Sequence, residues 1–480
     1  MSLYNREFFH LVVDCLLSGH PEMDAGRSVM PSVRIKQPLV SSDGNAAGQS
    51  SASSLIAAGN AASGKTVAPE PKLIRSLTRK HYKITEVKRG PETRIDGTVL
   101  TIREGIEKEA IDSQALVHDL KIEIITPDKY HTYSETIMDV QPIATKEKGC
   151  EVGSGVTRVL DGVIMMVTGT DDNGVQIGEF GSSEGYLDEN IMWGRPGAPD
   201  EGEIFIKTQV TIQAGTNMER PGPLAAHSAT DVITNEIRQA LKKLDDDSLV
   251  VDTEEFHQYR RPGKKKVIVV KEIMGQGAMH DNLLLPVEPV GILGAKPNVD
   301  IGNVPVIVSP LEILDGCIHA LTCIGPASKE MSRHYWREPL VLETLFDPDL
   351  DLCGVLLVGS PQINAEKFYV SKRVGMTCEA LDVDGAFVTT EGFGNNHIDF
   401  ASHIEQIGIP TVIIAALPPV VKQTGTPRAV APLVPMGANA GEPHNMDMQY
   451  GIVKEALEQL EILESPGQVV PLDYEYVAKV

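Results

Sequence analysis

Three short strand-like runs near the C-terminus, separated by helix-like segments, constrain the fold most. Residues 352–359 (LCGVLLVG) form a continuous apolar run, which is typical of a strand buried on both faces. Further strands are predicted over residues 384–390 and 410–416, with helices over residues 364–377 and 398–407 between the strands. This β-α-β-α-β order predicts parallel strands with right-handed crossovers, a Rossmann-like C-terminal region.

Ligands of such sheets bind beyond the carboxyl ends of the strands. Here those ends carry residues 359–361 (GSP) and 390–395 (TEGFGN). Two glycines directly after a strand let a ligand approach the backbone closely. Gly and Asn are also ordinary turn formers, so a simple turn is the alternative. The position favours a site that includes Glu391 and Asn395.

The middle of the chain predicts a second α/β region with a mixed sheet. A helix fits residues 227–244, where the apolar residues form one stripe. Strands are predicted over residues 120–126, 162–168, 204–212, 266–273 and 304–309.

The first part of the chain differs in composition from the rest. Residues 8–18 predict a short amphipathic helix, and residues 41–68 are rich in Ser, Ala and Gly, as in a disordered linker. The predicted domains are therefore residues 1–72, 73–322 and 323–480.

A phosphate-loop pattern lies within that linker, at residues 59–66 (GNAASGKT). A working phosphate loop follows a buried strand and opens a helix. Here the preceding sequence is low in complexity, and Pro69 and Pro71 follow. The surroundings thus argue against nucleotide binding.

The charge of the chain excludes two kinds of partner. Lys and Arg total 43 against 66 Asp and Glu, a formal net charge of −23. Such a surface repels nucleic acid and anionic lipid. With no apolar run long enough to span a bilayer, the chain is expected to be cytoplasmic.

Cys323 is the cysteine whose surroundings suggest chemistry. If residues 311–321 are helical, His319 and Cys323 face each other, and a nearby imidazole raises the thiolate fraction of a cysteine. Gly325 and Pro326 then end the element. The alternative is an ordinary helix end with a buried thiol.

Two segments around Cys323 resemble D-proline reductase proproteins, the precursors of pyruvoyl-containing subunits: residues 321–330 (LTCIGPASKE) and 333–340 (RHYWREPL). Residues 155–162 (GVTRVLDG) and 390–395 also resemble the component B proproteins of glycine, sarcosine and betaine reductases. The likeness covers residues 73–435.

The resemblance implies self-cleavage between Thr322 and Cys323. The Cys323 thiolate would attack the Thr322 carbonyl, and elimination followed by hydrolysis would leave a pyruvoyl group on the fragment that begins at residue 323. This pyruvoyl group is the cofactor that the resemblance implies, and no metal or nucleotide is expected.

The resemblance also implies the reaction and the partners. The pyruvoyl ketone would condense with D-proline and weaken its Cα–N bond. A selenocysteine of a partner subunit would open the ring to give 5-aminopentanoate, and a dithiol or an electron-donor protein would close the cycle. The two cleaved fragments would stay together in a hetero-oligomer.

Several side chains are candidates for this chemistry. Arg333 or Arg337 can hold the substrate carboxylate by a bidentate pair, and Asn395 is a further candidate for binding the substrate. Protons can be moved by His319, His334 and Glu391. A structural ion pair is the alternative for each charged residue.

Three other functions stay open. The chain can be a component B protein that acts on glycine, sarcosine or betaine, or a non-catalytic assembly or regulatory relative. A nucleotide-dependent enzyme built on residues 59–66 is the third.

Overall fold

The computed structural model describes residues 70–177, 184–191, 193, 196–217, 221–245, 247–273, 283–284, 299–300, 303–320, 331–361, 363–390, 397–408, 411–415, 419–422, 429–430 and 468–471. The helix predicted over residues 8–18, the linker and the phosphate-loop pattern of residues 59–66 lie outside the described residues.

One lobe is built on a four-stranded sheet in the order β5-β12-β10-β7. Strands β10 and β12 are parallel, whereas β5 and β7 pair antiparallel with their neighbours, so the sheet is mixed. The sheet and its two main helices are β5 (Val117–Ile125), β7 (Ile137–Gln141), β10 (Val163–Asp171), β12 (Ile204–Ile212), α2 (Ile106–Asp112) and α4 (Pro221–Lys242).

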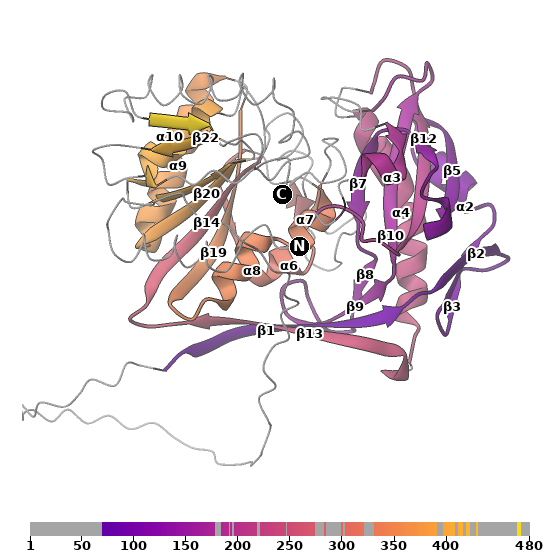
Figure 1. Cartoon of the computed structure of the whole chain (residues 1–480), viewed down its shortest axis with the longest axis horizontal. Coiled ribbons are helices and arrows are strands. Elements are labelled where there is room, and N and C mark those ends of the chain that lie inside the picture. Colours follow the sequence, from indigo (N-terminus) through magenta and orange to yellow (C-terminus); the bar gives the residue numbers. More distant parts are fainter. Residues whose placement is uncertain are drawn as a thin grey trace, which may run out of the picture.

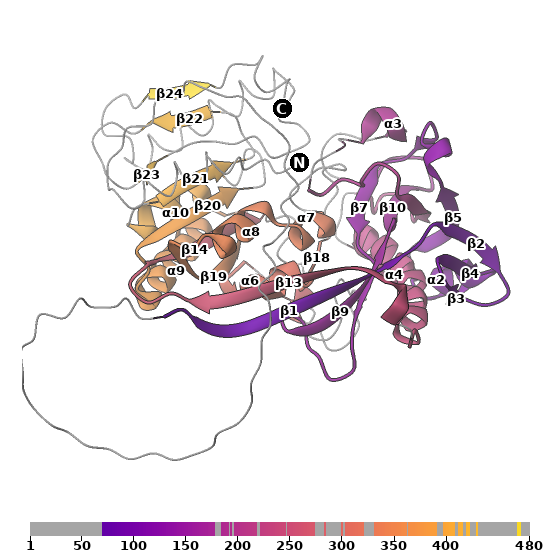
Figure 2. The same cartoon turned by 60° about the horizontal axis from the view of Figure 1, so that its bottom comes forward.

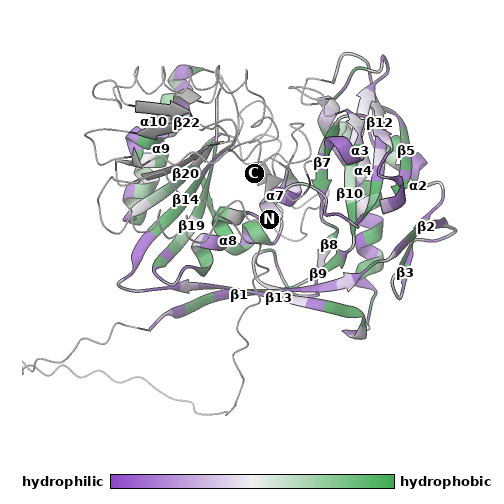
Figure 3. Cartoon of the chain, viewed as in Figure 1, coloured by the Kyte–Doolittle hydropathy of each residue, from purple (hydrophilic) through white to green (hydrophobic). Residues whose placement is uncertain are grey.

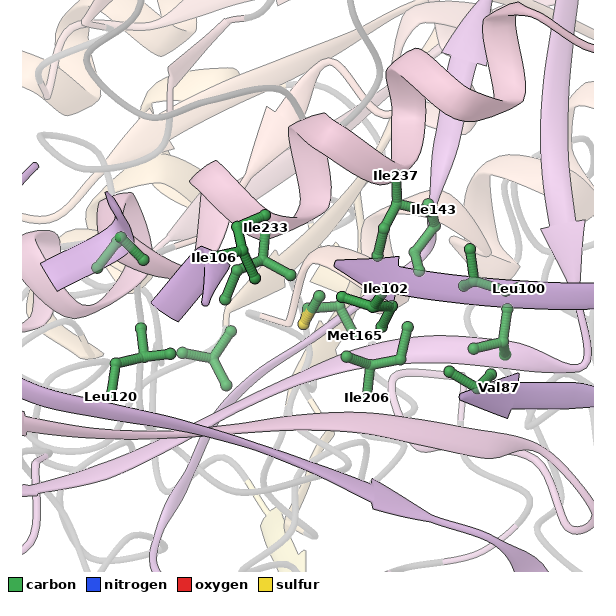
Figure 4. Close-up of a cluster of buried hydrophobic side chains, with 14 of the residues drawn as sticks. Val87, Leu100, Ile102, Ile106, Leu120, Ile143, Met165, Ile206, Ile233 and Ile237 are labelled. Atoms are coloured by element: carbon green, nitrogen blue, oxygen red, sulfur yellow. The ribbon is translucent and has the colours of Figure 1, made fainter. Parts of the chain in front are cut away.

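Strand β10 is buried on both faces because successive side chains point to opposite sides of the sheet. Met165 packs into the core beneath α4, together with Ile206 of β12 and Ile233 of α4 (Figure 4). Ile164 contributes to a separate core on the other face. This explains the continuous apolar run of the strand.

The other lobe contains a six-stranded sheet in the order β17-β19-β14-β20-β21-β23. Strands β14, β19, β20, β21 and β23 run parallel, and β17 is antiparallel to β19. The strands are β14 (Lys265–Ile273), β17 (Val306–Val308), β19 (Leu350–Gly359), β20 (Gly385–Thr390), β21 (Thr411–Ala415) and β23 (Ala429–Val430). Figure 3 shows hydrophobic colours over much of β14 and β19.

Five helices accompany this sheet: α6 (Pro310–Leu314), α7 (Ser332–Trp336), α8 (Pro339–Phe346), α9 (Asn364–Leu381) and α10 (His397–Ile407). Helices α9 and α10 pack against each other, and α7 lies between the two lobes (Figures 1 and 2).

A long antiparallel pair, β1 with β13, runs along both lobes (Figures 1 and 2). β1 also pairs parallel with β9, which continues the sheet to β8. These strands are β1 (Lys72–Lys83), β8 (Ala144–Lys146), β9 (Gly155–Asp161) and β13 (Val250–Arg260).

The remaining elements are short: β2 (Glu86–Gly90), β3 (Arg94–Asp96), β4 (Val99–Arg103), β6 (Tyr133–Ser134), β11 (Gly185–Tyr186), α3 (Leu187–Asn190), β15 (Leu283–Leu284), β16 (Val299–Asp300), β18 (Ile318–His319), β22 (Pro419–Lys422), β24 (Gln468–Pro471), and 3-10 turns at Pro127–Lys129 and Asp247–Leu249.

The predicted α/β class with a mixed sheet is confirmed. The Rossmann-like arrangement of the C-terminal region stays a prediction, because β14, from the middle of the chain, lies between β19 and β20. The domain limits at residues 72 and 322 also stay predictions. None of the helices among the described residues is long and apolar enough to cross a membrane.

The helix considered over residues 311–321 is wrong. Helix α6 ends at Leu314, Gly316 takes a left-handed conformation (φ 75°), and Ile318–His319 form strand β18, paired antiparallel with β15. A left-handed glycine ends a helix at little steric cost. The four-residue helical spacing between His319 and Cys323 therefore does not apply.

Candidate functional site

The predicted cleavage bond lies in residues 321–330, outside the described residues, but both flanks of this segment are described. The Ala320 N–H donates a hydrogen bond to Ser332 Oγ at 2.9 Å. Ser332 begins α7 and is fully buried. The two flanks of the segment with the predicted cleavage bond therefore lie beside each other and are both buried.

Asp139, on β7, anchors this contact. Ser332 donates to its carboxylate twice, from the backbone N–H (2.8 Å) and from Oγ (2.7 Å). Gln141 Nε2 (2.9 Å) and the Val140 N–H (2.9 Å) donate to it as well. Burial raises the pKa of Asp139 to about 7, although these hydrogen bonds act to lower it. Asp139 thus has a pKa suited to proton transfer near neutral pH.

His319 lies in the same buried polar cluster, which we define as Asp139, Gln141, His227, Asp231, His319 and Ser332. His319 Nε2 is 2.9 Å from Gln141 Nε2 and 3.9 Å from Asp139 Oδ2. Its Nδ1 is 3.7 Å from Asp231 Oδ2. With Gln141 donating, Nε2 accepts and the proton of a neutral imidazole sits on Nδ1.

Helix α4 supplies two members of the buried polar cluster, His227 and Asp231, which are four residues apart on one face. The His227 ring is 6.0 Å from that of His319, and its Nδ1–H donates to the Pro223 carbonyl at 2.9 Å. Burial lowers the pKa of His227 to about 4, so this imidazole is neutral at pH 7. The buried polar cluster therefore joins α4, β7, β18 and α7.

His334 occupies a separate buried site. Its Nε2 is 2.8 Å from Glu338 Oε2, and Lys271 Nζ is 2.9 Å from the same oxygen. Burial raises the pKa of Glu338, but Lys271 and His334 outweigh it and hold that pKa well below the usual value. Glu338 is thus ionised at neutral pH. Glu338 is the charged partner that His334 and Lys271 share.

Arg333 and Arg337 are each paired with carboxylates. Arg333 binds Glu203 through both nitrogens, at 2.6 and 2.7 Å. Arg337 binds Asp200 in the same way, at 3.0 and 2.6 Å. Such bidentate pairs hold the planar guanidinium firmly. Both arginines therefore tie α7 to residues 200–203 of the other lobe.

The other predicted site residues, Thr322, Cys323, Glu391 and Asn395, lie outside the described residues. The helix that follows Glu391 and Asn395 is described, and so is β20 before them.

The described cysteines behave mostly as buried thiols. Burial raises the pKa of Cys317 well above its ordinary value, that of Cys353 to about 11 and that of Cys378 to about 12. A protonated thiol is a poor nucleophile. These three cysteines are thus poor candidates for the reactive residue, in line with the sequence interpretation.

A second anchor precedes His319. Asp315, directly after α6, accepts hydrogen bonds from Lys146 Nζ (2.7 Å), Thr157 Oγ1 (2.5 Å) and the Gly153 N–H (2.8 Å). Thr157 belongs to the residues 155–162 that carry part of the family resemblance. These three hydrogen bonds fix the position of Asp315, four residues before His319.

Sequence reasoning missed Asp139, Gln141, Asp231 and Ser332. The available signal was Asp139 and Gln141 within the apolar stretch of residues 137–141, since charged residues are rarely buried without partners. For Ser332 no local signal existed, because its partner Asp139 is 193 residues away.

Comparison with known proteins identifies relatives. The model of glycine/sarcosine/betaine reductase component B subunits matches residues 222–431. Over 355 residues, or 74% of this chain, the sequence is 71% identical to the D-proline reductase proprotein PrdA of Acetoanaerobium sticklandii, of which 56% is covered. The D-proline reductase subunit gamma of that organism is 60% identical over 98 residues, 20% of this chain and 40% of the relative.

A more distant relative is the sarcosine reductase complex component B subunit alpha of Peptoclostridium acidaminophilum. It is 31% identical over 167 residues, 34% of this chain and 36% of the relative. No solved structure matches the chain significantly. The chain spans about half the length, or less, of these curated relatives. The resemblance seen around Cys323 is therefore confirmed: the chain is similar to the D-proline reductase proprotein, and its residues 222–431 match the model of glycine/sarcosine/betaine reductase component B subunits.

Proposed function

We propose that this chain is the proprotein of a D-proline reductase-type oxidoreductase and that it cleaves itself between Thr322 and Cys323. The observation that carries the proposal is the 71% identity over 355 residues to a relative named as a D-proline reductase proprotein. That relative extends beyond the aligned part, so the proposal concerns the region that the two chains share.

Self-cleavage would proceed on the chain's own atoms. The Cys323 thiolate attacks the Thr322 carbonyl carbon, the C–N bond breaks, and a thioester with a free amine at residue 323 forms. Loss of the Cα proton of residue 323 then breaks its Cβ–S bond and releases the upstream fragment as a thioacid. The dehydroalanine left behind takes up water and releases ammonia, which gives the pyruvoyl group.

The buried polar cluster fits this chemistry in two ways. First, the hydrogen bond from Ala320 to Ser332 restrains the chain on both sides of the scissile segment, and restraint of reacting groups lowers a barrier. Second, the thiol and Cα protons must be taken up by a base. His319 lies three residues before Thr322, and Asp139 has a pKa near 7, so both are candidates for that base.

When bound, the pyruvoyl group supplies an electron-withdrawing ketone that reacts with amines. For the substrate carboxylate, Arg333 and Arg337 are available only if Glu203 or Asp200 gives way, because both guanidinium groups are paired. We therefore assign these arginines to positioning α7. Asn395 remains the proposed substrate contact, and Glu391 remains a proposed proton-transfer residue. The proposed partners are a selenocysteine-containing subunit, the chain's own cleaved fragment and an electron-donor protein.

Intact mass measurement with N-terminal analysis of the smaller fragment tests the proposal. The wild-type chain should give two fragments, with a ketone in place of Cys323 that borohydride reduces. Cys323→Ala should leave the chain intact. The matched control is Cys317→Ala, six residues earlier, which should be processed as wild type. An active preparation with an unbroken chain and a free thiol at residue 323 refutes the proposal.

A second candidate function is component B of a glycine-type reductase. It is favoured by the match of residues 222–431 to that family and by the 31% identity to a sarcosine reductase subunit. Turnover of D-proline, glycine, sarcosine and betaine, with the selenoprotein partner supplied, separates the two. Lys65→Ala should leave turnover unchanged; a loss there would favour the nucleotide-dependent alternative.

A further inference from the structure

A second group of buried polar side chains lies at the carboxyl ends of β14 and β19, apart from the buried polar cluster defined above. Strand β14 separates the two faces of the sheet: Lys271 points to Glu338, and the next residue, Glu272, must point to the opposite face. On that face Glu272 meets Asp399 and His403 of α10. All three side chains are fully buried.

The ligand-type atoms of Glu272, Asp399 and His403 lie within 4.8 Å of one another. Two ligands at about 2.1 Å from one ion are at most about 4 Å apart, so side-chain shifts below about 1 Å would let all three reach a common ion. Asp399 and His403 are four residues apart in α10 and therefore share one helix face.

Lys367, from α9, orients the aspartate. Its Nζ donates to Asp399 Oδ1 at 3.0 Å and to Ser360 Oγ at 2.8 Å. A carboxylate ligand that is held by an outer partner through one oxygen presents the other oxygen to a metal. The Lys367 ammonium thus occupies Oδ1 and leaves Oδ2 for a ligand.

Two side chains of this group, His403 and Asp399, have buried polar atoms without partners among the described residues. Among the residues that the structure describes, neither ring nitrogen of His403 has a hydrogen-bond partner, and Asp399 Oδ2 has none. Buried polar atoms are nearly always paired, so such an exception points to a ligand between them.

We propose that Glu272, Asp399 and His403 bind a divalent transition-metal ion such as Mn²⁺. One imidazole and two carboxylates suit the divalent first-row ions, and the absence of a thiolate from this set disfavours the soft ions. The three ligands come from β14 and α10, which are far apart in the sequence, so the site ties the strand to the helix. The sequence, read alone, led to the expectation of no metal.

The test is a titration of the full chain with Mn²⁺ after treatment with a chelator, followed by calorimetry and electron paramagnetic resonance. Mn²⁺ is the probe because unprocessed cysteine thiolates bind it poorly. We expect one ion per chain, and a loss of affinity of at least about 10-fold in both His403→Gln and Asp399→Asn. Processing of the chain is not required for binding, so this result is independent of the proposed cleavage.

The matched control is His131→Ala, which removes the exposed group of His131, Asp188 and Glu189. Mn²⁺ binding that survives this change but is lost in His403→Gln supports the buried site of Glu272, Asp399 and His403. No binding to the wild-type chain, or binding lost only in His131→Ala, overturns it. If His403→Gln and Asp399→Asn do not fold, an anomalous difference map of Mn²⁺-loaded wild-type crystals tests the site directly. A peak between the three side chains supports the proposal, and a peak only elsewhere refutes it.

Discussion

Ser332→Ala should destabilise the chain more than most single-hydroxyl deletions, because Ser332 Oγ makes two buried hydrogen bonds. It donates to Asp139 Oδ2 (2.7 Å) and accepts from the Ala320 N–H (2.9 Å). Above about pH 7, where Asp139 is mainly ionised, a hydrogen bond to its carboxylate contributes roughly 1.5–3 kcal/mol, and an unpaired buried N–H costs roughly 1–3 kcal/mol. Allowing for relaxation, we expect a loss of about 3 kcal/mol.

The assay is urea unfolding followed by tryptophan fluorescence, since Trp336 lies at the end of the same helix, α7. All variants should carry Cys323→Ala, so that the proposed self-cleavage does not alter the chain. The matched control is Ser113→Ala, whose hydroxyl donates only to the Ala110 carbonyl near the surface. Its effect should stay below about 1 kcal/mol.

A double-mutant cycle with Asp139→Ala tests whether Ser332 and Asp139 stabilise the fold through their direct contact. The two residues touch directly, so their coupling energy should be at least about 1 kcal/mol. In a chain that keeps Cys323, Ser332→Ala should also slow the proposed cleavage, because the flanks of residues 321–330 lose their shared contact. Additive effects, or a change in stability no larger than that of Ser113→Ala, would refute the proposed role of this contact.

Three further predictions follow from other parts of the fold. Gly375→Ala should cost about 1–3 kcal/mol in urea unfolding, because an added Cβ would lie 2.3 Å from the Gln406 carbonyl oxygen and push α9 from α10; an unchanged midpoint contradicts this. Lys271→Met should cost about 3–5 kcal/mol by leaving the buried Glu338 charge with less compensation, and adding Glu338→Gln should recover part of that loss. The folded-state pKa of Asp139 (about 7) is above its ordinary 3.8, so its protonation stabilises the fold fully below about pH 4, and that contribution is lost as the pH rises through 7. Asp139→Asn should reduce this pH dependence of the free energy of unfolding by up to about 4 kcal/mol. Parallel stability–pH curves for the two proteins would refute this prediction.

Local patterns in the sequence were enough to locate many elements. The strand predicted over residues 204–212 is β12, and the one predicted over residues 266–273 is β14 within one residue. The helix predicted over residues 398–407 is α10, which begins one residue earlier. Hydrophobic periodicity reports these elements because it depends only on near neighbours along the chain.

The same local patterns failed after Leu314. An apolar run there was compatible with a longer helix, but Asp315 is held outside the helix by Lys146, Thr157 and Gly153. These partners come more than 150 residues earlier in the chain. A competing contact of that range is invisible to a window of neighbouring residues.

The sequence by itself determined the α/β class, the positions of the main strands and helices, and the family resemblance around Cys323, because each of these depends on short runs of residues. Only the tertiary structure decided that β14 lies between β19 and β20, that Asp139 meets Ser332, and that Glu272 meets Asp399 and His403. Such contacts depend on which distant strands pair and which buried polar groups must find partners, and the folded chain satisfies both conditions at once.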